Sequence, residues 1–261
     1  MQGSIQFLGT GGSAGVPIIG CRCRVCVGDQ EKNSRLRSSV LVRVREKSFL
    51  IDVTPDFRQQ ALRYRLEQPD ALLLTHTHYD HVGGLEELRA YTMKSHRPVA
   101  CYLSGQSFES VKRLYYYHFL PRDTSTSLRS LYAFHSFPDD SGTCEIDGVS
   151  VQYFSYRQGN MPVTGFRIGS FAYVTDIKQY DESIFSFLQH LDLLVVSAPR
   201  FEHSYMQLTL KEAIDFARKV GAKKTFFTHL SHEIDYEEVS SLLPEGVELA
   251  YDGLEQFFSI G

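Results

Sequence analysis

The sequence predicts an α/β fold with mixed β-sheets, on three observations. Apolar runs with the two-residue period of strands alternate with segments that have the apolar spacing of helices. Some neighbouring strand-like runs are separated only by short turns, as in hairpins, which favours mixed sheets over a purely parallel barrel. The 261 residues contain no long linker, low-complexity segment or visible repeat, so we expect a single domain over residues 1–261.

The predicted elements follow in chain order from these patterns. The first quarter is mostly sheet: a strand over 4–9, a glycine-rich stretch, a cysteine loop, and a hairpin of 38–44 with 48–52. A helix over 57–66 precedes a buried strand over 71–75, and another helix begins near 85. Further strands are predicted over 149–156, 164–169, 171–176, 191–197 and 223–229, with helices over 183–191 and 209–220.

Composition narrows the classes of function. The formal charge of −4 gives no overall basic character of the kind that binds phosphate backbones, so nucleic acid is the weaker expectation for a partner. No run of about 18 apolar residues is present, and the N-terminal residues lack a basic segment followed by a long apolar core. We therefore expect a cytoplasmic protein that is not embedded in a membrane.

A dense cluster of metal-binding side chains follows the predicted strand over 71–75. Three histidines and an aspartate occupy six positions, as His76, His78, Asp80 and His81. Imidazole and carboxylate groups suit zinc, iron or manganese, and two metal ions need about this many donors. A polar loop is the alternative, but the density of donors favours a metal site.

The pattern H-x-H-x-D-H after an apolar strand resembles the signature of the metallo-β-lactamase fold. The other motifs of that fold occur in order, with Asp52, Asp176 and His229 each ending a predicted strand. The LGTGG near the start, the C-x-C-x-x-C loop and the sequence THLSH more narrowly resemble the phosphodiesterases of the carbon-phosphorus lyase pathway. The resemblance covers essentially the whole chain and implies a four-layered αβ/βα sandwich of two mixed β-sheets.

The same resemblance implies a dinuclear centre. One ion would be bound by His76, His78 and Asp176, and the other by Asp80, His81, Asp176 and His229. Asp80 and Asp52 would be the carboxylates that serve catalysis, Asp52 by orienting the ligands and the attacking water. An aspartate that merely accepts backbone N–H groups at the end of its strand is the alternative for Asp52.

A second zinc site is implied for Cys21, Cys23, Cys26 and His232. Thiolates are soft ligands, and three of them with one imidazole complete a tetrahedral zinc site with no position open to substrate. Free buried thiols or a redox-active trio are the alternatives. The site would therefore be structural.

Two glutamines stand where the related enzymes carry histidines. Gln158, in QGNMPVTGFR, occupies the place of a metal ligand, and Gln207 that of a general acid. A neutral amide oxygen is a weaker ligand than imidazole, so we expect one or two catalytic ions, zinc or manganese. Glutamine also exchanges no proton near neutral pH, which leaves His203 as the available replacement acid, unless it is only a surface residue.

These residues favour a metal-dependent hydrolase, and most directly a phosphodiesterase that attacks small or cyclic phosphate esters with a metal-activated water. A ribonuclease of the tRNA-maturing type is one alternative, and a degenerate binding protein with weak or no catalysis is another. A homodimer also stays open, since the aromatic run over 114–119 is typical of core but suits a substrate platform or dimer contact as well. Arg37 and Arg58 fit either phosphate binding or a solvent-facing role.

Overall fold

The computed structural model of the protein describes residues 1–120, 132–202 and 204–260. Within these residues the strands form two sheets of seven strands each. The first sheet has the order β14-β1-β2-β3-β4-β5-β6, with β1 Gln2–Gly9, β2 Ser39–Val44, β3 Lys47–Ile51, β4 Ala71–Leu73, β5 Val99–Leu103, β6 Tyr132–Ser136 and β14 Glu255–Ser259. The second has the order β13-β12-β11-β10-β9-β8-β7, with β7 Ser141–Ile146, β8 Val149–Gln158, β9 Met161–Ile168, β10 Phe171–Val174, β11 Leu193–Ser197, β12 Lys224–Thr228 and β13 Val247–Leu249.

Both sheets are mixed, and in each of them one half is antiparallel and the other half parallel. The pairs from β14 to β3 are antiparallel and those from β3 to β6 are parallel. In the second sheet the pairs from β7 to β10 are antiparallel and those from β10 to β13 are parallel. The predicted hairpin of 38–44 with 48–52 is the β2–β3 pair.

Alternation along the strands produces the layers. Phe49 and Ile51 of β3 enter a core shared with Tyr173 of the second sheet, whereas Leu50 points to a separate core beneath the helices. Phe226 and Phe227 of β12 divide in the same way between the shared core and the core under the second set of helices. Three apolar layers thus separate helix, sheet, sheet and helix, which confirms the predicted four-layered sandwich.

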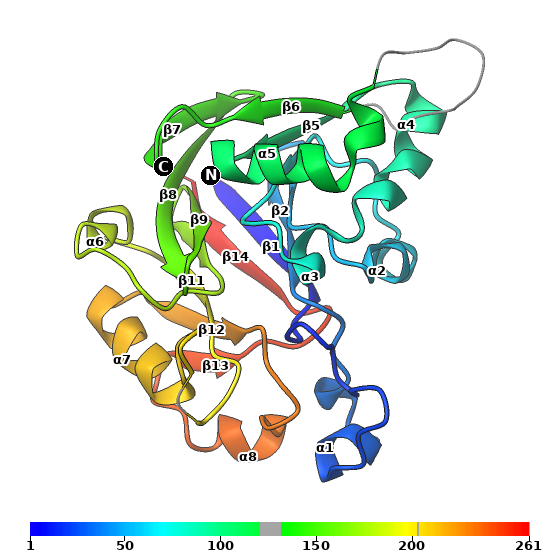
Figure 1. Cartoon of the computed structure of the whole chain (residues 1–261). Coiled ribbons are helices and arrows are strands. Elements are labelled where there is room, and N and C mark those ends of the chain that lie inside the picture. The colour runs from blue at the N-terminus through cyan, green and yellow to red at the C-terminus, as the bar shows by residue number, and fades with distance from the viewer. Residues whose placement is uncertain (121–131, 203, 261) are drawn as a thin grey trace.

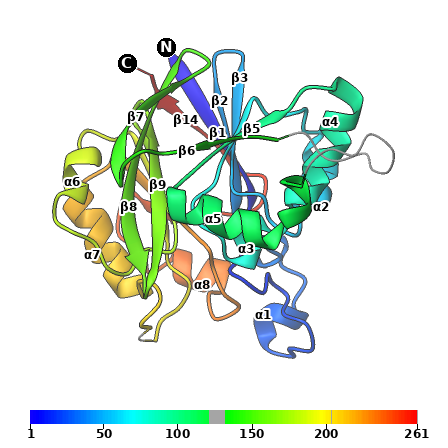
Figure 2. The same cartoon turned by 45° about the horizontal axis from the view of Figure 1, so that its top comes forward.

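The helices cover the outer faces of the two sheets. On the first sheet lie α2 Phe57–Tyr64, α3 Tyr79–Val82, α4 Arg89–Ser95 and α5 Gly105–Leu114, with 3₁₀ turns η2 Leu85–Leu88 and η3 Tyr116–His118. On the second lie α6 Ile184–Phe187, α7 Leu210–Val220 and α8 Tyr236–Ser240. Figure 1 shows α6 and α7 on the opposite side of the molecule from α2 and α4, and Figure 2 keeps this arrangement.

A short lobe projects from the sandwich near the start of the chain. It contains α1 Arg24–Val27 and the 3₁₀ turn η1 Glu31–Asn33, drawn in blue at the edge of Figures 1 and 2. The lobe is tied to α8 by Arg24, whose guanidinium lies 2.6 Å from the carboxylate of Glu238. Among the helices of the described residues, none has the length and apolar character needed to cross a bilayer.

Some predicted boundaries differ from those observed. The helix predicted over 183–191 is shorter in the structure and consists of α6 alone. Leu188 and Leu191 are buried in the turn that connects α6 to β11. The aromatic run is mixed rather than core, since Tyr116 is 62% exposed while Tyr115 and Tyr117 are partly buried. Strands β5, β6, β7, β13 and β14 and helices α5 and α8 were not anticipated from the sequence patterns.

The junction between α3 and η2 depends on a glycine. A Cβ atom on Gly84 would lie 2.0 Å from the carbonyl oxygen of Thr54, a backbone atom that cannot move away cheaply. We predict that Gly84→Ala lowers the free energy of unfolding by about 1–3 kcal/mol, the usual cost of overpacking. Thermal denaturation followed by circular dichroism measures this. The control is Gly105→Ala in α5, where the nearest atom to the new Cβ is 3.5 Å away; an equal loss in both variants would contradict the prediction.

Candidate metal centre

The predicted site residues lie at neighbouring strand ends. Asp52 directly follows β3, His76 follows β4 by two residues, and His229 directly follows β12. Because these strands run parallel within their sheets, their carboxyl ends open on one edge of the sandwich. Asp52, Asp176 and His229 all have positive φ values, of 62°, 57° and 59°. Such backbone is uncommon outside glycine and turns each side chain out of its strand toward the site.

Helix α3 supplies the remaining residues of the H-x-H-x-D-H motif. His78 is its N-cap, and its backbone carbonyl accepts from the N–H of His81 at 3.0 Å. Asp80 and His81 are adjacent in α3 and both are buried, with exposures of only 7% and 1%. The chain therefore changes from strand to helix within the motif, so that its side chains approach the site from different directions.

Asp52 is fully buried and connects three parts of the site. Its carboxylate accepts hydrogen bonds from the backbone N–H and the hydroxyl of Thr75, both at 2.8 Å. It also lies 2.7 Å from Nδ1 of His81. The carboxylate of Asp52 holds the proton of His81 on Nδ1. Nε2 of the neutral ring then has a lone pair that points into the site. The hydroxyl of Thr75 further contacts Nδ1 of His76 at 3.0 Å and fixes that ring in the same way.

Two groups of donors lie close enough to hold an ion: Asp80, His81 and His229, and His76, His81 and Asp176. Nε2 of His81 lies 3.4 Å from Oδ2 of Asp80 and 3.2 Å from Oδ2 of Asp176. Nε2 of His229 lies 3.2 Å from Oδ2 of Asp80 and 3.5 Å from Oδ1 of Asp176. Around a tetrahedral zinc with bonds of about 2.0–2.2 Å, donor atoms lie about 3.3–3.6 Å apart. His81 Nε2 is buried and has no hydrogen-bond partner, as expected of an atom positioned for a metal. These residues therefore fit the ion that the sequence implied.

Electrostatics at the centre favour bound cations. Burial opposes the charge of His81, but the surrounding carboxylates, Asp176 first, raise its pKa well above the usual value. Burial would raise the pKa of Asp176, yet His229 and His81 hold it well below its ordinary range. The carboxylates are thus ionised, and neutralising them inside the protein requires a proton on histidine or a metal ion.

The two glutamines both contact Asp176. Gln158 Nε2 donates to Asp176 Oδ1 at 2.8 Å, and Gln207 Nε2 donates to the same oxygen. Gln158 is 4% exposed and Gln207 6% exposed. The structure therefore places both residues in the site that the sequence assigned to them, but as hydrogen-bond donors.

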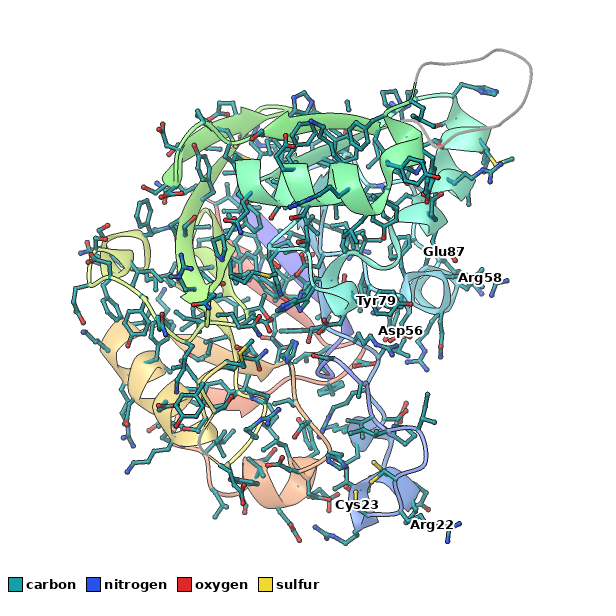
Figure 3. All side chains as sticks on the ribbon, in the orientation of Figure 1. Arg22, Cys23, Asp56, Arg58, Tyr79 and Glu87 are labelled. Atoms are coloured by element: carbon teal, nitrogen blue, oxygen red, sulfur yellow. The ribbon has the colours of Figure 1, made fainter. Side chains whose placement is uncertain are left out.

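The three cysteines and His232 form a second cluster in and beside the lobe with α1. Their sulfur atoms lie 3.3, 3.5 and 3.6 Å from His232 Nδ1, in the order Cys21, Cys23 and Cys26. Sulfur and nitrogen ligands of tetrahedral zinc lie about 3.5 Å apart. The backbone N–H of Cys26 is the main cause that lowers the pKa of Cys23 to about 6, whereas burial raises that of Cys26 to about 11. Figure 3 shows Cys23 near the outer tip of the molecule, away from Tyr79 of α3.

A buried arginine that the sequence did not single out holds the His232 segment in place. Arg35 is 1% exposed, and its guanidinium donates to the carbonyl oxygens of Ser231 at 3.0 Å and Ile234 at 2.7 Å, on either side of His232. Its backbone pairs with Val16, which lies in the loop between the glycines and the cysteines. Arg35 thereby fixes the cysteine loop against the segment that carries both His229 and His232. An isolated arginine in a polar stretch gives no sequence signal for this role.

A cavity of about 640 Å³ is lined by residues of both candidate metal sites. His78, Asp80, Gln158, Gln207 and His229 line it at the catalytic centre, and His232 is the residue of the cysteine cluster that lines it. The remaining wall comes from the glycine-rich loop and from the segment with Pro199, Arg200 and Met206. The N–H groups of Gly11, Gly12 and Gly15 donate within the protein, so this loop forms a wall rather than a full cradle for phosphate.

Other predicted residues lie elsewhere. His203 lies outside the described residues, so its role stays a prediction. Arg37 binds Asp56 at 2.8 Å and the carbonyl of Ser13 at 2.9 Å, and is thus engaged within the protein. Arg58 is exposed on α2, where Figure 3 shows it on the outer surface. Arg200 is the arginine that lines the cavity, and the sequence reasoning missed it.

Comparison with known proteins gives a consistent picture. Residues 47–230 match the beta-lactamase superfamily domain. This chain belongs to that superfamily. A crystal structure of a new diphosphatase from the PhnP family has a TM-score of 0.92 and 34% identity, and the match covers 100% of this chain and 98% of that one. Zinc-bound PqqB from Methylobacterium extorquens, at 21% identity, a TM-score of 0.77 and coverage of 97% and 99%, shows the fold alone.

A curated relative is longer than this chain. The octanoyltransferase of Porphyromonas gingivalis is 36% identical over 253 residues, which are 95% of this chain but only 50% of that protein. The other half of that protein has no counterpart in this chain, so its name describes more than the matched part. The PhnP-family diphosphatase and PqqB are both matched over nearly their whole length.

The cysteine cluster predicts a specific loss of metal. Cys26→Ser removes one of the four converging donors, so we expect the metal content to fall by about one zinc per chain. Elemental analysis of protein purified without chelator measures this. The control is Cys144→Ser, because Cys144 is half-buried outside any cluster and its replacement should leave the content unchanged. Equal metal content in both variants would show that the cluster binds none.

The contact between Asp52 and His81 predicts an effect on metal affinity. Asp52→Asn keeps the size of the side chain and tolerates the φ of 62°, but lacks the charge and half of the acceptor capacity. We expect the metal affinity of the catalytic centre to fall about 10- to 100-fold, as for other residues that orient metal ligands. Competition with a chromogenic chelator measures it, and an unchanged affinity would make Asp52 a purely structural turn residue.

Proposed function

We propose that the protein is a metal-dependent phosphodiesterase that hydrolyses small or cyclic phosphate esters. One observation carries the proposal: Asp80, His81, Asp176 and His229 converge at zinc-like separations beside a cavity large enough for a small organic phosphate. The likeness to a PhnP-family diphosphatase supports phosphorus chemistry over the other reactions of the superfamily.

The chemistry divides between metal and protein. A zinc or manganese ion held here would supply an activated water and polarise a phosphoryl oxygen. Asp80, His81, Asp176 and His229 would hold that ion, and Asp52 keeps His81 in the tautomer that suits this role. Arg200, exposed at the cavity wall, offers a positive charge to the phosphate.

The remaining assignments extend the same proposal. The cluster of Cys21, Cys23, Cys26 and His232 binds a structural zinc, which fixes one wall of the cavity. Its unpaired thiols fit a reducing compartment, so we place the protein in the cytoplasm. The partner is a small phosphodiester rather than nucleic acid, in line with the formal charge of −4. A homodimer stays a prediction.

Turnover of bis(p-nitrophenyl) phosphate with added manganese or zinc tests the proposal. We expect hydrolysis that depends on the added metal, and a fall of more than about 100-fold in kcat/KM for Asp80→Ala, which removes a ligand. Asp140→Ala, at an exposed position outside the catalytic cavity, should retain full activity.

Two other outcomes would replace the proposal. No turnover with any metal, in protein whose cysteine site is loaded, would support the degenerate binding protein. Cleavage of precursor tRNA at rates far above those for small diesters would support the ribonuclease. Loss of activity in Asp80→Ala and Asp140→Ala alike would point to general instability instead of a metal role for Asp80.

A further inference from the structure

We propose that this chain holds a single catalytic metal ion, at Asp80, His81, Asp176 and His229, and that Gln158 and Gln207 exclude a second. The inference rests on the proposed function only in treating the buried aspartates and histidines as a metal centre. It departs from the dinuclear arrangement that the resemblance implied. The two glutamines become positioning residues for Asp176.

The first argument is the number of acceptor positions on Asp176. A carboxylate offers about four lone-pair positions. Gln158 and Gln207 donate to its Oδ1, and the hydroxyl of Thr175 donates to its Oδ2 at 2.7 Å. Three of the positions are therefore occupied by hydrogen bonds from the protein. One position remains, on the oxygen that lies 3.2 Å from His81 Nε2, and this is enough for one ion and not for a bridge between two.

The second argument concerns the orientation of the amides. Nε2 of Gln158 lies 2.8 Å from Oδ1 of the buried Asp176, a distance at which the amide N–H donates to the carboxylate. If the amide of Gln158 were rotated by half a turn, its oxygen would face this carboxylate and the two would repel each other. The Nε2 group must therefore face Asp176, and an N–H group has no lone pair to offer a metal.

The third argument concerns the histidines on the far side of Asp176. Nε2 of His76 and Nδ1 of His78 lie 2.9 Å apart, which is a hydrogen-bond distance and shorter than the separation of about 3.3 Å expected around a shared zinc. The donors grouped with His76 are His81 and Asp176, and both are already assigned to the first ion, so among the described residues the pair has no donor of its own for a second ion. The two rings therefore form a hydrogen bond with each other, in which one proton lies between Nε2 of His76 and Nδ1 of His78.

The same arrangement leaves one acceptor for the substrate. Oε1 of Gln158 is buried and has no hydrogen-bond partner among the described residues, while Gln158 lines the catalytic cavity. A buried carbonyl oxygen without a donor costs free energy until a ligand supplies one. A hydroxyl group of the substrate, next to the phosphate, is the group that fits this position.

Metal counting tests the inference without reference to turnover. Elemental analysis of the full chain, loaded with zinc and freed of excess metal, should give two ions per chain: one at the cysteines and one at the catalytic centre. Gln158→His should raise the count to three, because imidazole supplies the missing lone pair. Gln152→His is the matched control, since it adds a histidine to the same strand β8 outside the catalytic cavity and should leave the count at two. Three ions in the unaltered chain, or two in a folded Gln158→His variant, would overturn the inference.

Manganese gives a second readout that does not depend on any variant. Manganese prefers oxygen and imidazole ligands and should avoid the cysteine site, so the paramagnetic resonance spectrum reports the catalytic centre. We expect the signal of an isolated ion; an exchange-coupled pair at saturating manganese would overturn the inference. One bound ion without hydrolysis would remove the proposed function and leave this inference standing, and hydrolysis with two bound ions would do the reverse.

Discussion

The buried carboxylate of Asp52 is the interaction on which the site depends. It lies at the end of β3, is fully buried, and holds both the Thr75 backbone that leads into the histidine motif and the ring of His81. Burial raises the pKa of Asp52, and the nearby His81 opposes that rise; Asp52 in turn is one of three carboxylates, after Asp176 and Asp80, that raise the pKa of His81. The contact with His81 helps to position α3, and with it Asp80, together with the backbone bond of 2.8 Å from Val53 to the carbonyl of His81.

The two metal clusters are mechanically connected through one segment of seven residues, 229–235. His229 begins it at the catalytic centre, His232 reaches the cysteines, and Asp235 caps α8. The guanidinium of Arg35 donates hydrogen bonds to the carbonyls of Ser231 and Ile234 in this segment, and the backbone N–H of Gly12 donates to the carbonyl of Leu230. A zinc ion at the cysteines would therefore fix the geometry of a catalytic ligand, since the segment has few free backbone groups with which to adjust. The cysteine loop would thus influence the position of His229 without contact between its metal and a substrate.

Replacing histidine by glutamine changes more than the strength of one ligand. An imidazole can offer a lone pair to a metal, whereas the glutamines here give N–H groups to Asp176 and reduce its capacity to bridge. The substitutions at 158 and 207 act on the same oxygen, so their effects are coupled and are not two independent weakenings. The centre is closely packed at these positions, with Gln158, Gln207 and Asp176 all buried.

The sequence by itself determined the fold class, the strand-end positions of Asp52, Asp176 and His229, and both clusters of metal donors. These features are local: an apolar period specifies a strand, and a run such as H-x-H-x-D-H or C-x-C-x-x-C places donors a few residues apart. Short or half-exposed elements escaped prediction because their apolar pattern is weak; β7, for example, has only one fully buried residue. The sequence also identified Gln158 and Gln207 but not their effect on Asp176. That effect and the role of Thr75 arise from contacts between strands of one sheet, and the role of Arg35 arises from a contact between the two sheets; in each case only the fold brings the residues within hydrogen-bond distance. The tertiary structure therefore decided how the donors are shared between proton and metal, because hydrogen-bond geometry is set by distances that no sequence spacing records.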